Sequence, residues 1–199
     1  MNKYIQIIKN YLATRNRDFI IGTSIVAVGV IVIAAIAIYA YNSVPKVVYQ
    51  PAKACELLSL QTAKELLGAK AINSTAKDPE LARSGNTATS ECGYTDGTGD
   101  TENMLVAAIS VRSGVNDEGV ALNKKEFSIN KSGKAIKSVK DLGDDAYYNE
   151  SLGQLNILDG RKWIILNYGV GSAPQANTIE QAIELANEIL PPTASTSDL

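Results

Sequence analysis

Apolar and polar positions divide this chain into one long apolar run and a following region of shorter periodic segments. The run covers residues 19–41 and contains no charged residue. A helix rises about 1.5 Å per residue, so about 20 apolar residues cross a hydrocarbon core about 30 Å thick. A strand of that length would be unusual, because most strands have about 3–10 residues. The pattern therefore predicts a single transmembrane helix over residues 19–41.

Helix signals occur at three places after this run. Ser59 and Gly68 mark the two ends of a helix whose apolar residues share one face. The apolar spacing of residues 116–129 predicts a second helix, which docks on a sheet through Phe127. Residues 178–190 predict a closing amphipathic helix that begins with a capping box.

Strand signals lie between these helices. Apolar and polar positions alternate over residues 104–112, which predicts a strand with one buried face. Two apolar runs around Asp159-Gly160 predict a tight hairpin. Residues 71–90 are polar and aperiodic, and we expect a mobile loop there. The predicted fold class is α+β, with helices covering a mainly antiparallel sheet.

These elements define the predicted domain organisation of the 199-residue chain. The apolar run leaves room for one domain of ordinary size. The predicted segments are a cytoplasmic leader (1–18), the transmembrane helix (19–41), a stalk with two prolines (42–52), an extracytoplasmic α+β domain (53–191) and a disordered tail (192–199).

Charge distribution predicts the orientation of the chain in a membrane. The leader carries four basic residues and one acidic residue, whereas the remainder carries fifteen basic and twenty acidic residues. The positive-inside rule then places the N-terminus in the cytoplasm and the domain outside. The mildly acidic outer part argues against nucleic acid as a partner.

A cleavable signal peptide is the alternative to a permanent anchor. Small residues at Ala35 to Ala37 supply a cleavage site. However, the apolar run is longer than the 7–15 residues typical of a signal peptide core, and its leader is also long. We therefore expect an uncleaved signal anchor, with the lipid bilayer as the partner of residues 19–41.

Two cysteines, Cys55 and Cys92, lie on the predicted outer side. Thiols in an oxidising compartment usually pair, and a disulfide here would close a loop of 37 residues. In the chain-entropy model such a bond contributes about 3–4 kcal/mol. A reactive or metal-binding thiol is the alternative, although two cysteines without histidine make a poor metal site.

Motifs for metals, cofactors and catalysis are incomplete in this chain. It contains no histidine, which excludes histidine-based triads and histidine-ligated zinc. Asp96, Asp100 and Glu102 resemble the start of a calcium loop, but the EF-hand glycine and closing glutamate are missing, so an acidic turn is preferred. Gly169-Val-Gly171 lacks the third glycine of a dinucleotide loop. No catalytic, cofactor-binding or metal-binding residue is predicted.

Four aromatic residues are candidates for ligand contact: Tyr147, Tyr148, Trp163 and Tyr168. Exposed rings of this kind would form a binding surface. The alternative is that most of them belong to the core, because Trp163 and Tyr168 lie within an apolar strand.

Three segments carry a resemblance to a known family: ACELLSLQTAKELLG, ECGYTD and VKDLGDDAYYNESLGQLNILDGRKWIILNYG. They resemble a bacterial cell-envelope family of unknown function that is best known from actinobacterial lipoproteins. The resemblance implies a PsbP-like α/β/α sandwich and a Cys55–Cys92 disulfide. This chain differs in having an apolar run in place of a lipidated cysteine. The matching residues are Cys55, Leu57, Leu58, Cys92, Tyr94, Leu142, Gly143, Asp144, Ala146, Tyr147, Gly160 and the helix from Thr178.

The function expected from these observations is a non-catalytic binding module of the bacterial cell envelope, anchored in the membrane. Its ligand would be an envelope protein, a glycan or a small apolar molecule. Two alternative functions are compatible with the same sequence. One is a histidine-free hydrolase or transferase, and the other is a structural subunit of a membrane complex.

Overall fold

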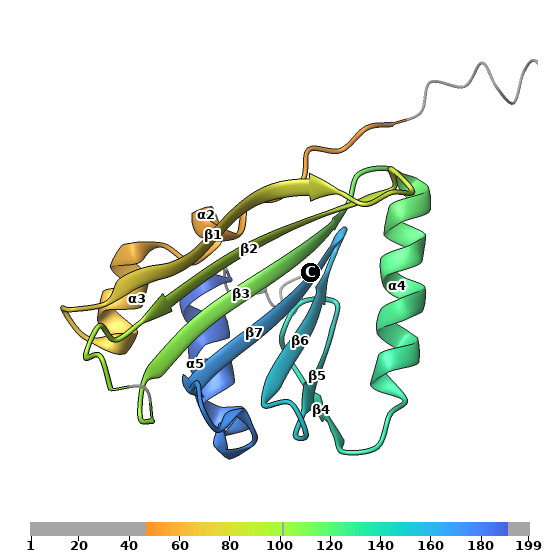
Figure 1. The fold of residues 1–199 in the computed structure, drawn as a ribbon. Helices are drawn as coiled ribbons and strands as arrows, with labels where there is room; N and C mark the ends of the chain where they lie inside the picture. The colour runs from red at the N-terminus through yellow and green to blue at the C-terminus, as the bar shows by residue number, and fades with distance from the viewer. Residues whose placement is uncertain (1–46, 101, 191–199) are drawn as a thin grey trace, which may run out of the picture. The chain divides into compact units, whose positions relative to one another are not determined.

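Seven antiparallel strands form one sheet in the order β1-β2-β3-β7-β6-β5-β4, within the residues that the computed structural model describes, 47–100 and 102–190 (Figure 1). No helix in these two ranges is long and apolar enough to cross a membrane. The predicted leader (1–18), transmembrane helix (19–41) and disordered tail (192–199) lie outside the described residues, as does the first part of the predicted stalk.

The elements follow one another as two strand meanders joined by a helix. The strands are β1 (Ile72–Leu81), β2 (Thr87–Thr95), β3 (Leu105–Gly114), β4 (Ile136–Val139), β5 (Asp145–Asn149), β6 (Gln154–Asp159) and β7 (Lys162–Val170). The helices are α2 (Ala54–Leu57), α3 (Leu60–Leu67), α4 (Asp117–Lys131) and α5 (Ile179–Ile189), with a 3-10 turn η1 (Pro174–Ala176). The fold is therefore α+β, as the sequence predicts.

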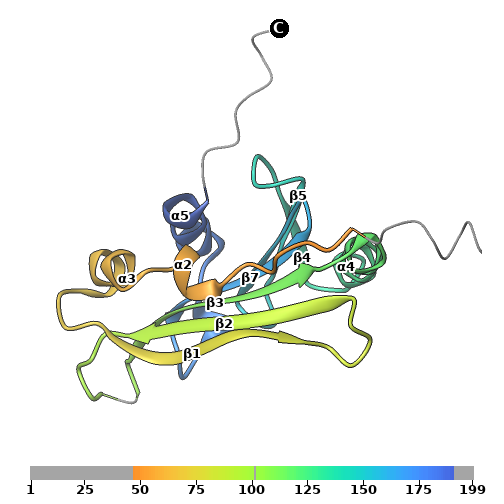
Figure 2. The same cartoon turned by 90° about the horizontal axis from the view of Figure 1, so that it is seen from above.

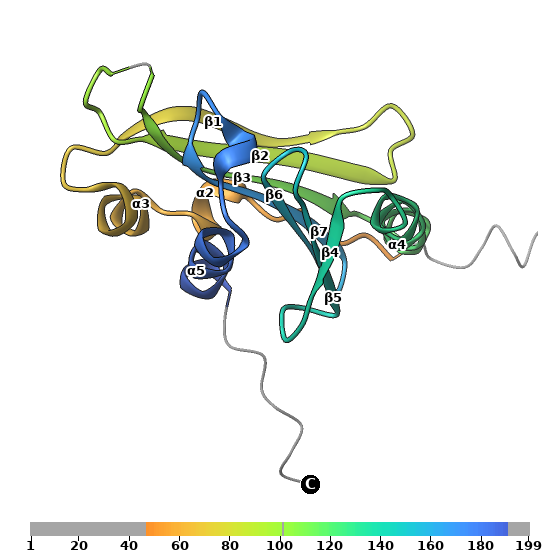
Figure 3. The ribbon, with the colours of Figure 1, turned by 90° about the horizontal axis from the view of Figure 1, so that it is seen from below.

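Helices cover both faces of this sheet. Helices α2, α3 and α5 pack on one face, where the larger core lies (Figure 2). Helix α4 packs on the opposite face and contributes Phe127 to a smaller core, while Figure 3 shows it at the other end of the sheet from α3. No helix of the described residues lies over the half of that face formed by β1, β2 and the start of β3 (Figure 1).

Strand β3 shows why the sheet has two different faces. Ala107, Ile109 and Val111 are buried in the larger core, at 0–2 % exposure, whereas the residues between them are only partly buried. Successive side chains of a strand point to opposite faces, so this alternation places the apolar set under α2, α3 and α5. The strand predicted over residues 104–112 is confirmed.

Helix ends also agree with the sequence signals. The Ser59 hydroxyl accepts a hydrogen bond from the Thr62 N–H at 3.1 Å and starts α3, and Gly68 with φ +97° ends it. At α5, the Thr178 side chain and the Gln181 side chain each accept from the other residue's backbone N–H, at 3.3 and 2.9 Å. This reciprocal pair is the predicted capping box.

One prediction is wrong: residues 71–90 do not form a loop. They contain the whole of β1 and the start of β2, paired in antiparallel register from Ile72↔Thr95 to Leu81↔Ala88. Strand β1 is an edge strand with mostly exposed polar side chains, so it lacks the apolar alternation that identifies strands. Pro79 and two register shifts also interrupt it, as is common at sheet edges.

The last residues of the predicted stalk belong to the domain. We call residues 47–53 the entry segment. The Tyr49 N–H donates to Val115 O at 2.8 Å, and its hydroxyl donates to Asp117 Oδ1 at 2.7 Å. The Arg161 guanidinium lies 4.3 Å from the centre of the Tyr49 ring. The sequence of this segment shows one proline and no periodicity, and gives no sign of these long-range contacts.

Packing of Phe127 leads to a stability prediction. Its ring is 1 % exposed, with ring centroids 4.9 Å from Tyr147 and 5.9 Å from Trp163. Phe127→Ala should lower the free energy of unfolding by about 3–5 kcal/mol, through lost burial and a cavity. Ile129→Ala on the same helix is the control, because Ile129 is 60 % exposed and should cost less than about 0.5 kcal/mol. Guanidinium unfolding of the full chain, followed by the fluorescence of its single tryptophan, would measure both. Equal effects of the two changes would contradict this packing.

Candidate functional site

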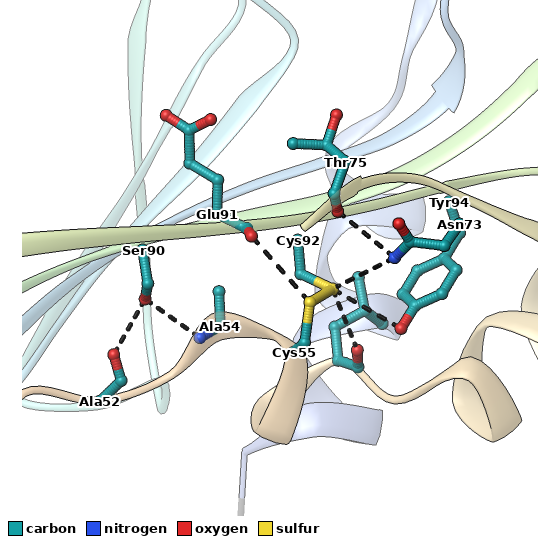
Figure 4. Close-up of a disulfide and its surroundings, with 10 residues drawn as sticks. Ala52, Ala54, Cys55, Asn73, Thr75, Ser90, Glu91, Cys92 and Tyr94 are labelled. Carbon is teal, nitrogen blue, oxygen red and sulfur yellow. Dashed lines mark hydrogen bonds between the residues drawn. A yellow bond between two sulfur atoms is a disulfide. The ribbon is translucent and has the colours of Figure 1, made fainter. Parts of the chain in front are cut away.

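The predicted disulfide is present and joins α2 to β2. Cys55 and Cys92 are bonded, with Cα atoms 5.0 Å apart. Cys92 is 1 % exposed, whereas Cys55 is only partly buried. Figure 4 shows Ser90 beside the bond, where its hydroxyl accepts from Ala54 N at 3.0 Å and donates to Ala52 O at 2.9 Å. The disulfide and Ser90 together attach the start of the domain to β2.

The four candidate aromatic residues do not form one surface. Tyr147 and Trp163 are 2 % and 8 % exposed and pack with Phe127 under α4. The Trp163 Nε1–H donates to Asn156 Oδ1 at 3.0 Å. Burial raises the pKa of Tyr147 to about 12. These two rings are core residues with little surface for a ligand.

Tyr148 and Tyr168 lie on the opposite face, in the larger core. The Tyr148 hydroxyl donates to Asn177 O at 2.6 Å, and the Tyr168 hydroxyl donates to Leu66 O at 3.2 Å. Burial raises the pKa of both phenols, so both stay neutral at physiological pH. Their rings fill space between the sheet and the helices, and their hydroxyls fix backbone carbonyls. Tyr148 and Tyr168 therefore belong to the core, which is the second of the two predictions made for the four aromatic residues.

The acidic segment around Asp96 is a network of turns. Asp96 accepts hydrogen bonds from the Thr98 N–H at 3.1 Å and from the Leu105 N–H at 3.0 Å. Asp100 accepts from the side chain and the backbone N–H of Asn103 and from the Glu102 N–H. These donors hold the pKa of both aspartates below the usual range. In the described ranges no three acidic, cysteine or histidine residues form a possible metal site. The carboxylates accept hydrogen bonds from backbone N–H groups, as is typical of acidic turns.

A hollow lies on the α4 face of the sheet, away from α4. We call it the sheet groove, and its volume is about 320 Å³. Its floor is made of two directly paired sets, Val106 with Gly169 and Ala108 with Asn167. These side chains alternate with the buried apolar residues of β3 and β7, so they point to the opposite face. Ala108 and Gly169 are small, so the surface is hollow at these two positions.

The segment after β7 forms the rim of the sheet groove. Gly171 N–H donates to Met104 O at 2.9 Å, and Val170 N–H donates to Asn177 Oδ1 at 2.9 Å. A Cβ on Gly169, which has φ +135°, would lie 2.1 Å from Asn177 Oδ1. The glycines that resembled part of a dinucleotide loop therefore allow the rim to fold back against the sheet.

The side chains that line the sheet groove are uncharged. Among the described residues no Asp, Glu, Lys or Arg lines it, and its polar side chains include the amides of Asn167 and Asn177. Met104, Val106 and Pro174 supply apolar surface beside these amides. Such a surface suits an uncharged ligand that combines apolar groups with hydrogen-bonding groups. Sequence analysis missed this site, whose only signal was the pair of closely spaced glycines.

Comparison of the chain with protein-family models, curated proteins and solved structures finds no match. The assignment of the sheet groove therefore depends on its geometry alone.

A glycine substitution tests how the rim is held. Gly169→Ala should lower the free energy of unfolding by about 2–4 kcal/mol, because the new methyl group meets Asn177 at a backbone angle that suits glycine. Gly85→Ala is the matched control, since Gly85 also has positive φ (+71°) but has no atom within 4 Å of the added Cβ. It should cost about 1–2 kcal/mol. Chemical denaturation measures the difference, and a Gly169→Ala change no worse than the control would contradict the described rim.

Proposed function

We propose that this protein is a non-catalytic binding module of a bacterial cell envelope, held in the membrane by residues 19–41, with its domain outside. The observation that carries the binding role is the uncharged sheet groove, which lies over β3 and the end of β7, where no helix of the described ranges covers the sheet. A groove of about 320 Å³ lies at the lower end of the size range of small-ligand sites.

The extracytoplasmic location is supported by the disulfide. Disulfides persist in oxidising compartments and are rare in reducing ones. Cys55 and Cys92 are the only cysteines of the chain, and both are in the bond. The uncharged run and the basic leader of the sequence favour the same orientation. The proposed membership of the envelope family, with its PsbP-like sandwich, rests on the sequence motifs alone.

The uncharged lining limits the class of ligand. Burying a charge without a partner is unfavourable, so a strongly ionic ligand would gain little from this surface. Asn167 and Asn177 can exchange hydrogen bonds with amide or hydroxyl groups of a peptide or glycan, while Val106 and Pro174 contact apolar groups. We propose an uncharged envelope ligand of this kind.

Thiol labelling of intact cells would test the location. A membrane-impermeant maleimide should modify the full chain only after reduction, because both cysteines are paired and the domain is outside. The number of maleimides added per chain is the readout, and two are expected. Labelling that needs permeabilised cells and no reductant would overturn the proposed topology.

Photo-crosslinking would test the binding role. The chain has two methionines, Met1 and Met104, and Met104 lines the sheet groove. A diazirine analogue of methionine, incorporated in living cells, should give a light-dependent adduct on the tryptic peptide 84–112. The Met104→Leu variant is the control, because it keeps the shape of the groove and loses the reactive group. Light converts the diazirine to a carbene, which reacts either with a bound ligand or with water. If the only product at Met104 is the water adduct, the groove has no ligand and the proposed binding role is wrong.

A further inference from the structure

The two cysteines of the disulfide differ in their exposure to solvent. Cys92 Sγ belongs to a residue that is 1 % exposed in the larger core. Cys55 is partly buried and lines a second hollow of about 210 Å³ between α2 and β1. We call this hollow the β1 groove, and Lys53 and Lys77 also line it. An attacking thiolate can therefore approach Cys55 from the groove, whereas Cys92 is covered by protein.

Two hydrogen-bond donors lie near the buried sulfur, together with one acceptor, the Leu58 carbonyl oxygen at 3.7 Å. The Tyr94 hydroxyl lies 3.5 Å from Cys92 Sγ, and Asn73 Nδ2 lies 3.8 Å from it (Figure 4). A disulfide sulfur has no hydrogen, so the hydroxyl and the amide are the donors. Asn73 reaches this sulfur at a register shift of β1, between Asn73 and Thr75, and such irregularities redirect side chains. Donors in these positions stabilise a thiolate more than a neutral sulfur.

We propose that the Cys55–Cys92 bond is a site of directed thiol–disulfide exchange, in which Cys55 is attacked and Cys92 is the leaving group. A thiolate of an external dithiol attacks Cys55 Sγ, a new sulfur–sulfur bond forms, and the bonding electron pair moves to Cys92 Sγ. The second thiolate of the dithiol then displaces Cys55. The dithiol is oxidised to a disulfide, and the two cysteines, once protonated, are reduced thiols.

Access to Cys55 and stabilisation of the Cys92 thiolate favour this direction. Attack occurs at the more accessible sulfur, and the sulfur whose thiolate is better stabilised leaves faster. Both effects select Cys55 for attack, because access comes from the β1 groove and the donors lie at Cys92. The charges of the β1 groove add no net attraction, because Lys53 and Lys77 line it together with Glu56 and Asp78, and the two ammonium groups are paired with Glu56 and Glu91.

Glutathione mapping tests the direction on the full-length protein in detergent. After brief exposure to reduced glutathione and quenching with N-ethylmaleimide, trypsin separates the cysteines into peptides 54–64 and 84–112. We expect glutathione on the Cys55 peptide and N-ethylmaleimide on the Cys92 peptide, with a preference of at least about tenfold. In guanidinium chloride this preference should fall toward one. Equal modification of the two peptides in the native protein, or exchange only in denaturant, would overturn the proposal.

A pair of variants separates leaving-group stabilisation from general loosening of the domain. Tyr94→Phe keeps the ring and removes the donor, so the initial rate of exchange should fall by about threefold. Tyr148→Phe is the control, because its hydroxyl bonds to Asn177 O and does not contact the disulfide. If the Tyr94 hydroxyl only held the local structure together, Tyr94→Phe would loosen the site and raise the initial rate of exchange. An unchanged or faster rate in Tyr94→Phe would therefore contradict the role of Cys92 as the leaving group.

Discussion

Pairing of β3 with β7 is the contact on which the rest of this domain depends. Strands β1 to β3 form one meander and strands β4 to β7 form another, and only the β3–β7 ladder joins them into one sheet. The ladder runs from Leu105↔Val170 to Ser113↔Lys162, so it links segments far apart in the chain. The larger core and the floor of the sheet groove extend across this line.

Helix α4 reinforces the same junction. It connects the two meanders in sequence, and its Asn123 is fully buried. The Asn123 Nδ2 donates to Arg112 O on β3 at 2.9 Å and to Arg161 O before β7 at 3.1 Å. One side-chain amide therefore satisfies backbone carbonyls of both meanders. Its own Oδ1 has no hydrogen-bond partner among the residues that the structure describes, and such a buried acceptor is unfavourable, so the two bonds of the amide nitrogen offset part of that cost.

Much of the fold could be predicted from local patterns, because those patterns record burial. Strand β3, helix α4, the β6–β7 hairpin and the capped α5 each have one buried face or a strong turn signal, and all four were predicted. Strand β1 has no buried face, so its residues gave no such pattern. The β3–β7 pairing and the contacts of Tyr49 depend on residues distant in sequence, which periodicity does not report. The disulfide was predictable because the chain offers only one pair of cysteines.

The candidate aromatic site was predicted less well, for a reason that strand geometry explains. Tyr147 and Tyr148 are neighbours on β5, and Trp163 and Tyr168 are an odd number of positions apart on β7. Side chains at such spacings point to opposite faces of a sheet, so each pair was bound to be divided. The sheet groove was missed because Ala108 and Gly169 are small, and a hollow is recognised only when the paired strands are known.

The entry segment has a mechanical consequence. Tyr49 is bonded to Val115, just after β3, and to Asp117 of α4. The Ala52 N–H donates to Ser113 Oγ on β3 at 3.0 Å, and Cys55 is bonded to β2. A pulling force applied to the chain before residue 47 would thus reach interior strands first, and neither the edge strand β1 nor the short β4–β5 hairpin would carry the initial load. The covalent bond to β2 comes last in this series, so it would stop the extension after the weaker contacts had yielded. Tension on the chain would then peel the entry segment while the sheet behind the disulfide stayed folded.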